Sequence, residues 1–399
     1  MIFYTPTGAR SAYFGDHCFA HTSMSTFEPN SVYWYDQHDA AIKQRPFSAF
    51  LDQRHWDHLQ NDRTSKILFF YGDEYFNLID LQDWAETIIK RNINPEQVFI
   101  VCMDQNFVDW ATRQLQKLRV NGVNITHCNV LLNKVTVHEP LPYEKRFSAF
   151  SRNYGSVNTT RPWRLYMYAK LFLNGTLDNF HYTFNTIHPY PYVGFYPEPD
   201  KSKIVEHLRN FDINITEPIK DWVEGMPYTI DREELRNKFS NDIYHMLQTS
   251  GVHLVIESHF DPFWNFSRHR SLVSPEKFSP AFPTEKLYKA VACSKPFIMF
   301  STPFFLKELK QLGYRTFSPY INEDYDNIVD DVARANAIAD EIKRLNDLPE
   351  DKFQEMLKYC EDACVHNLSV LQKELNTPLE FTGNFAWLNE SFLPMAIRK

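Results

Sequence analysis

Residues 284–289 read Thr-Glu-Lys-Leu-Tyr-Lys, and their types and spacing suit the binding of a phosphate group. Thr284 can cap a helix that starts here, and Glu285 suits the positive amino end of that helix. Lys286 and Lys289 are three residues apart, so both ammonium groups can reach an anion held at the helix start. The alternative is a capped surface helix with solvated lysines, which is the commoner meaning of such a pattern when it stands alone.

The surrounding sequence favours the binding interpretation. An apolar run over residues 251–256 ends in Glu257 and Ser258, as a central strand of an open α/β sheet delivers polar groups to its carboxyl edge. Ligands of such sheets bind at that edge. A second apolar run over residues 297–300 predicts another buried strand directly after the helix.

A second basic cluster lies earlier in the chain, after a short predicted strand over residues 147–150. It begins with Ser151, Arg152 and Asn153, and Arg161 and Arg164 flank the predicted start of a helix. Strand, basic loop and helix is the order found at phosphate sites, and planar guanidinium groups suit phosphate oxygens. Surface salt bridges are the alternative role for these arginines.

In this order, the segments resemble the nucleotide-sugar-binding half of GT-B glycosyltransferases. They are most similar to a bacteriophage group related to the fucosyltransferase and exostosin-like enzymes. The resemblance continues through residues 309–317, the acidic segment 323–326 and Arg334, and it covers roughly residues 147–345. It implies an α/β protein of two Rossmann-like domains that face each other across a cleft.

The resemblance also implies roles for single residues. Arg152 and Lys286 would bind the diphosphate of a nucleotide sugar, and Glu285 would hydrogen-bond the ribose. Glu257 and Ser258 would lie near the transferred sugar or the nucleotide. Ser151, Asn153, Arg161, Arg164, Thr284 and Lys289 complete the expected donor site, with the reach of Arg161, Arg164 and Lys289 depending on helix orientation.

The first part of the chain alternates predicted strands with predicted helices, which indicates a parallel sheet. The strands cover residues 67–73, 97–104 and 123–128, and the helices cover 80–90 and 106–118. We expect an acceptor domain over 1–142 and a donor domain over 143–375 with an insertion near 186–250. Residues 376–399 would form a tail that packs back on the first domain.

Asp73 and Asp104 stand at the carboxyl ends of two of these strands, so each is a candidate catalytic base for the acceptor hydroxyl. A turn or helix-cap role is the alternative for both. Asp324 and Asp326 match the D-x-D metal motif of GT-A enzymes, but we interpret them as carboxylates at a helix start. We therefore expect no metal and no permanently bound cofactor.

Composition excludes several classes of protein. The chain has 399 residues and only 11 glycines, and it lacks the G-x-G-x-x-G run of dinucleotide-binding enzymes. A net charge of −8 disfavours an extended nonspecific nucleic-acid surface, although DNA or a glycan stays open as the acceptor.

No apolar stretch is long enough to cross a membrane, and the six scattered cysteines suit a reducing compartment. We expect a cytoplasmic protein, in the host cytoplasm if the chain is viral. A non-catalytic module that binds a phosphorylated ligand or a polysaccharide is the alternative function.

Overall fold

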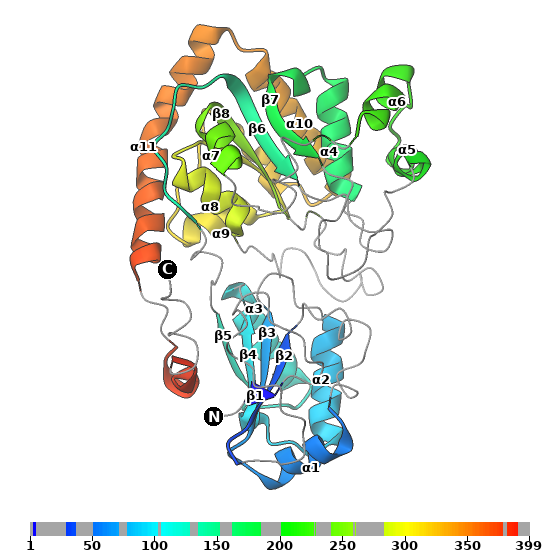
Figure 1. Cartoon of the computed structure of the whole chain (residues 1–399), viewed down its shortest axis with the longest axis vertical. Coiled ribbons are helices and arrows are strands. Elements are labelled where there is room, and N and C mark those ends of the chain that lie inside the picture. The colour runs from blue at the N-terminus through cyan, green and yellow to red at the C-terminus, as the bar shows by residue number, and fades with distance from the viewer. Residues whose placement is uncertain are drawn as a thin grey trace. The chain divides into compact units, whose positions relative to one another are not determined.

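The computed structural model contains two parallel β-sheets, each in its own α/β unit, which confirms the expected fold class of two Rossmann-like domains (Figure 1). The first unit comprises Met1–Asn133, Asn265–Phe282 and Thr377–Lys399, and the second comprises Lys134–Trp264 and Pro283–Asn376. The structure describes residues 3–4, 29–36, 51–71, 78–102, 105–127, 135–151, 162–184, 201–226, 228, 241–257, 260, 283–377 and 381–389.

The first sheet has five parallel strands in sequential order, β1-β2-β3-β4-β5. They are β1 (Phe3–Tyr4), β2 (Val32–Asp36), β3 (Lys66–Tyr71), β4 (Val98–Cys102) and β5 (Asn124–His127). The connecting helices are α1 (Gln53–Asn61), α2 (Leu78–Lys90) and α3 (Gln105–Lys117). This confirms the strands and helices predicted between residues 67 and 128, while β1, β2 and α1 have no counterpart in the sequence analysis.

Alternation along the strands sends side chains of this sheet to two covered faces. Ile67, Phe69 and Ile100 pack with apolar residues of the three helices in one core, where Phe69 stacks on Trp84 at 3.7 Å between ring centroids. Phe99 points to the other face and makes edge contacts with the rings of Phe385 and Trp387. The described segment 381–389 thus covers the face that the helices leave open.

The second sheet has four parallel strands in the order β7-β6-β8-β9. They are β6 (Lys145–Ser151), β7 (Phe180–Phe184), β8 (Ser250–Ile256) and β9 (Phe297–Phe300). The helices of this unit are α4 (Pro162–Leu173), α5 (Lys201–Asn210), α6 (Glu217–Glu224), α7 (Asn241–Gln248), α8 (Glu285–Ala292), α9 (Phe305–Gln311), α10 (Asp331–Asn346) and α11 (Glu350–Asn376).

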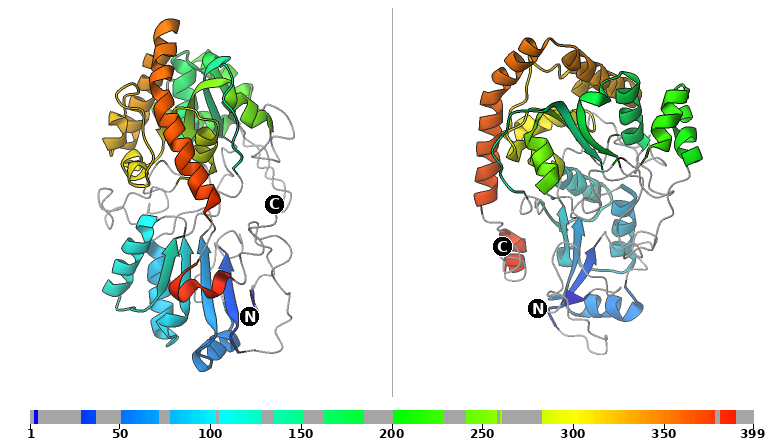
Figure 2. Two further views of the ribbon diagram at one scale, coloured as in Figure 1. Left: turned by 90° about the vertical axis from the view of Figure 1, so that its left-hand side faces the viewer. Right: turned by 45° about the horizontal axis from the view of Figure 1, so that its top comes forward.

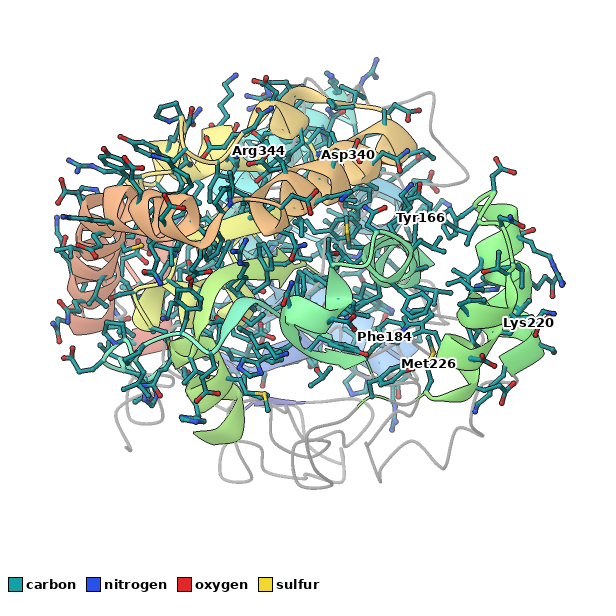
Figure 3. The ribbon with its side chains drawn as sticks, turned by 90° about the horizontal axis from the view of Figure 1, so that it is seen from above. Tyr166, Phe184, Lys220, Met226, Asp340 and Arg344 are labelled. Atoms are coloured by element: carbon teal, nitrogen blue, oxygen red, sulfur yellow. The ribbon has the colours of Figure 1, made fainter. Side chains whose placement is uncertain are left out.

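Helices cover both faces of the second sheet. α7 and α8 pack against β8 on one face, and α4 and α10 lie together behind the other face (Figure 1). Seen from above, Tyr166 on α4 lies beside α10, where its hydroxyl donates to Asn336 Oδ1 at 2.8 Å (Figure 3). The 27-residue helix α11 runs along one side of this unit and contacts α8 (Figure 2).

Strand order creates a switch point in this sheet. From β6 the chain passes through α4 to β7 on one side, whereas from β8 it passes through α8 to β9 on the other side. The segments that leave β6 and β8 therefore diverge at the carboxyl edge between two neighbouring strands. Open α/β sheets bind their ligands at such a point.

Candidate functional site

Glu257 directly follows β8 at the switch point, and its carboxylate is the centre of the described site. The side chain is 4% exposed, and the Glu257 amide donates to Phe300 O of the neighbouring strand at 3.0 Å. Seven consecutive buried residues form β8, so the strand is fixed before the chain reaches this glutamate. A buried carboxylate needs partners that replace its lost hydration.

Thr284 and Lys286 supply those partners from the start of α8. The Thr284 hydroxyl lies 2.9 Å and 2.7 Å from the two oxygens of Glu257, and the Thr284 amide donates to Oε1 at 3.3 Å. Lys286 Nζ lies 3.5 Å from Glu257 Oε2 and 3.0 Å from Thr284 Oγ1. Thr284 Oγ1 also accepts from the Lys286 amide at 3.3 Å, which confirms Thr284 as the helix cap.

Glu285 contributes a second carboxylate to the same group. Its Oε1 lies 3.5 Å from Lys286 Nζ, and its side chain is 10% exposed. The Lys286 ammonium is therefore close to two carboxylates while its own side chain keeps 19% exposure. These three charges sum to −1, so this group alone does not form a strongly cationic site.

Arg164 reaches the site from α4, the helix that follows β6. It is 3% exposed, and its Nη2 donates to the main-chain carbonyl of Glu257 at 3.2 Å. The structure thus brings together five of the residues that the sequence analysis selected: Arg164, Glu257, Thr284, Glu285 and Lys286. They come from three segments, and Arg164 is 93 positions from Glu257 in the chain.

Lys289 lies close to His253 of β8. Lys289 is 7% exposed on α8, and burial together with the charge of Lys289 lowers the pKa of the imidazole of His253 to about 3. His253 stacks on Phe150, and its Nδ1 lies 2.9 Å from Ser148 Oγ. Lys286, three residues earlier on α8, pairs with Glu257 and Glu285.

The side chains of the remaining predicted site residues lie outside the described part of the chain. Asp73, Asp104, Arg152, Asn153, Arg161 and Ser258 lie outside the described residues, and of Ser151 only the backbone, at the end of β6, is described. β6 and β8 are adjacent in the sheet, with Ser148 opposite His253. Ser151 therefore ends the strand next to the one that Glu257 follows.

The acidic segment 323–326 has a structural role at the starts of helices, as the sequence predicts. Asp324 and Asp326 lie in a short 3-10 helix (Asp324–Asn327), and α10 begins only at Asp331. Asp326 accepts from the amides of Leu306 at 2.9 Å and Lys307 at 3.3 Å, so it caps the preceding helix α9. Asp330 caps α10 by accepting from Ala333 N.

Among the residues with described positions, no group of three or more His, Cys, Asp or Glu side chains has an arrangement that could hold a metal ion. Within the same part of the chain, no helix combines the length and the apolar character needed to cross a bilayer.

Comparison with known proteins yields matches at the level of structure. No protein-family model matches the sequence, and no curated protein matches it significantly. The pneumococcal O-GlcNAc transferase GtfA in complex with UDP and GlcNAc superposes with a TM-score of 0.42 and 12% identity, over 86% of this chain and 56% of that one. A UDP-forming trehalose-phosphate synthase from Burkholderia xenovorans gives 0.39 and 10%, over 87% of this chain and 73% of that one.

A GtfA/B complex is similar at a TM-score of 0.40 and 11% identity, over 88% of this chain. The present chain spans 57% of that neighbour and 56% of GtfA, a little over half of their lengths. These structural neighbours are GT-B glycosyltransferases.

Proposed function

We propose that the chain is a glycosyltransferase that uses a nucleotide diphosphate sugar as donor. The observation that carries this proposal is the convergence of Glu257, Thr284 and Lys286 at the switch point of the second sheet. The second unit would hold the donor and the first unit the acceptor. The sequence resemblance to the bacteriophage group supports the same function.

The charges in the site suggest which residues would bind the diphosphate of the donor and which would bind its ribose. Two carboxylates already surround Lys286, so the ammonium neutralises only part of a diphosphate. Arg152 and Arg161, on the segment that follows β6, would provide the remaining positive charge for the departing nucleotide. Glu285 suits the ribose hydroxyls, because a carboxylate accepts hydrogen bonds and cannot donate them.

Three further properties belong to this proposal. The protein would act without a metal, because lysine and arginine would stabilise the leaving group. Asp73 or Asp104 would take the proton of the acceptor hydroxyl. The acceptor would be a base of viral DNA or a glycan, and the reaction would take place in the cytoplasm.

A thermal-shift panel of UDP, GDP, ADP, CMP and their sugars tests the donor site. A ligand at 100 times its Kd stabilises the folded state by about 2.7 kcal/mol, which corresponds to a rise in Tm of roughly 5–10 °C for a domain of this size. We expect Arg152→Ala to abolish the shift and Lys286→Ala to reduce it, with the larger loss for Arg152. Lys352→Ala, an exposed lysine on α11, is the control.

Two results would contradict the donor site. If Arg152→Ala and Lys286→Ala both keep the full shift, these residues do not bind the diphosphate. If no nucleotide or nucleotide sugar shifts the Tm of the parent protein, the proposed function is wrong. Unchanged activity after treatment with EDTA is the expected result for metal independence.

A non-catalytic binding module is the second candidate. It is favoured by one observation: Glu257, Thr284 and Lys286 form a buried, mutually paired group that is suited to ligand binding. Release of free nucleotide from the winning nucleotide sugar separates the two functions. A glycosyltransferase hydrolyses its donor slowly without acceptor, whereas a binding module releases no nucleotide.

A further inference from the structure

Two buried arginines bind main-chain carbonyls just after β8. Arg164 on α4 donates to Glu257 O at 3.2 Å, and Arg334 on α10 donates to Phe260 O at 2.7 Å. The two arginines are 3% and 1% exposed. The residue that carries the central carboxylate of the site and the residue three positions after it are therefore held from two different helices.

Arg334 also joins Phe260 to the neighbouring segments at the same edge of the sheet. Its Nε donates to Ser301 O, just after β9, at 3.1 Å. Its Nη1 donates to Ile328 O at 2.9 Å and to Val329 O at 3.2 Å. One planar guanidinium group thus links the exits of β8 and β9 to the segment before α10, a task that needs several donors in a rigid fork.

Ring packing fixes Phe260 as well. The guanidinium carbon of Arg334 lies 4.1 Å from the ring centroid of Phe260, within the range of a cation–π contact. On β9, the ring of Phe300 stacks on Phe260 at 3.9 Å with an interplanar angle of 10°. Trp163 on α4 contacts the same ring at 5.1 Å.

We propose that Arg334, together with Arg164, is a positioning residue of the donor site. This inference rests on the proposed function. Arg334 is too deeply buried to touch a nucleotide, so it would act by holding Phe260, as Arg164 holds Glu257, in the position that suits donor binding. A site whose residues are fixed before binding loses less conformational freedom when the ligand arrives, which raises affinity.

Arg146 provides a matched control at the opposite, amino end of the sheet. Its Nη1 donates to the carbonyls of Leu345, Asn346 and Leu348, and its Nη2 pairs with Glu350 at 3.0 Å. Its guanidinium carbon lies 4.8 Å from the ring of Phe353. Arg334 likewise pairs with a carboxylate, Asp331 Oδ1, at 2.5 Å, so the two arginines make the same kinds of contact. Arg334, however, holds Phe260, three residues after Glu257.

The experiment compares Arg334→Lys with Arg146→Lys at a temperature where both variants are folded. Lysine keeps the charge and loses the fork, so both substitutions should lower the Tm. Calorimetric titration with UDP or GDP, whichever binds the parent protein, should give a Kd at least about tenfold higher for Arg334→Lys. Arg146→Lys should bind within about twofold of the parent, because its contacts lie away from the site.

A purely structural role would lower the Tm of Arg334→Lys and leave its Kd at the parental value, and that result would overturn the proposal. Phe260→Leu is the milder second variant, and it should raise the Kd in the same direction even if Arg334→Lys fails to fold. Parental affinity in Phe260→Leu together with an unfolded Arg334→Lys would also count against positioning. Failure of the parent to bind any nucleoside diphosphate would instead remove the proposed function and this inference together.

Discussion

At the scale of single residues, the site depends on how a few charges are paired. The Thr284 hydroxyl has one proton, which it donates to Glu257, and it accepts from both the amide and the ammonium of Lys286. This threonine therefore links the carboxylate to the lysine as well as capping α8. Each hydrogen bond to a charged group contributes about 1.5–3 kcal/mol to stability. A donor diphosphate would compete with Glu257 for the same ammonium group.

Asp326 gives a prediction about pH at this scale. Burial raises the pKa of this carboxyl to about 6, although the amides of Leu306 and Lys307 donate to it and favour the charged form. The folded state therefore binds the proton more tightly than the unfolded state, whose pKa is near 3.8. As the pH rises from about 4 to about 6, the free energy of unfolding should fall by at most about 3 kcal/mol through this group.

Asp326→Asn should remove that dependence, since asparagine has no carboxyl proton and keeps one oxygen that can accept from the start of α9. His253 acts in the opposite direction, because its lowered pKa makes the folded state lose stability as the pH falls below 6.5. Only the difference between variant and parent therefore isolates Asp326. Urea unfolding at pH 4.5 and pH 7.5 measures it, and a difference that is the same at both pH values would contradict the assignment.

At the scale of elements, β8 and α11 approach each other at Gly251 of β8, which has no side chain. A Cβ added to Gly251 would lie 2.9 Å from Arg146 O and 2.9 Å from Cε1 of Phe353 on α11. Gly251→Ala should therefore destabilise the second unit by about 1–3 kcal/mol through overpacking. Denaturant unfolding measures the change, and Phe353→Leu in the same chain should recover part of the loss by removing the ring edge.

Gly175→Ala is a useful comparison, because a Cβ there meets nothing within 4 Å and the cost comes only from its φ of 68°. Phe353→Leu should not relieve that variant. Equal relief of Gly251→Ala and Gly175→Ala would show that the ring contact is not the cause.

Continuous apolar runs made four of the nine described strands predictable from sequence. β3, β4, β8 and β9 are such runs, and buried parallel strands have this pattern because both of their faces are covered. β7 reads Phe-His-Tyr-Thr-Phe, and because of its polar residues the sequence does not show the pattern of a buried strand. Aromatic packing stabilises this edge strand, as in the stacking of Phe180 on Phe147. β2 escaped prediction for a similar reason, because Tyr, Trp and Asp interrupt its pattern.

Sequence predicted which residues meet at the site better than it predicted what they contact. Thr284 was recognisable as a cap because cap chemistry is local. The pairing of Lys286 with Glu257, and the contact of Arg164 with a carbonyl, depend on how α8 and α4 pack on the sheet. The contacts of Arg334 were unpredictable for the same reason, because the sequence around an arginine on a helix does not show whether its side chain is buried.

At the scale of the whole molecule, the chain returns to its first unit after completing the second. Phe385 and Trp387 cover Phe99 of β4, and Asn384 Nδ2 donates to Asn124 Oδ1 of β5 at 2.6 Å. Lys66 Nζ lies 5.4 Å from the ring centroid of Trp387. One face of the first sheet thus depends on residues more than 250 positions away.

Phe385→Ala should therefore destabilise the first unit selectively, although residue 385 follows the whole second unit in sequence. Phe385 is 6% exposed, and loss of a buried phenylalanine ring costs about 3–5 kcal/mol. Hydrogen exchange should become faster at the amides of β3 and β4 and stay at the parental rate in β8 and β9, because stability is local to each cooperative unit. Tyr359→Ala, at an aromatic residue that is 51% exposed on α11, should change neither set. Faster exchange in β8 equal to that in β4 would mean that the two units unfold as one, and the division of stability between them would then be wrong.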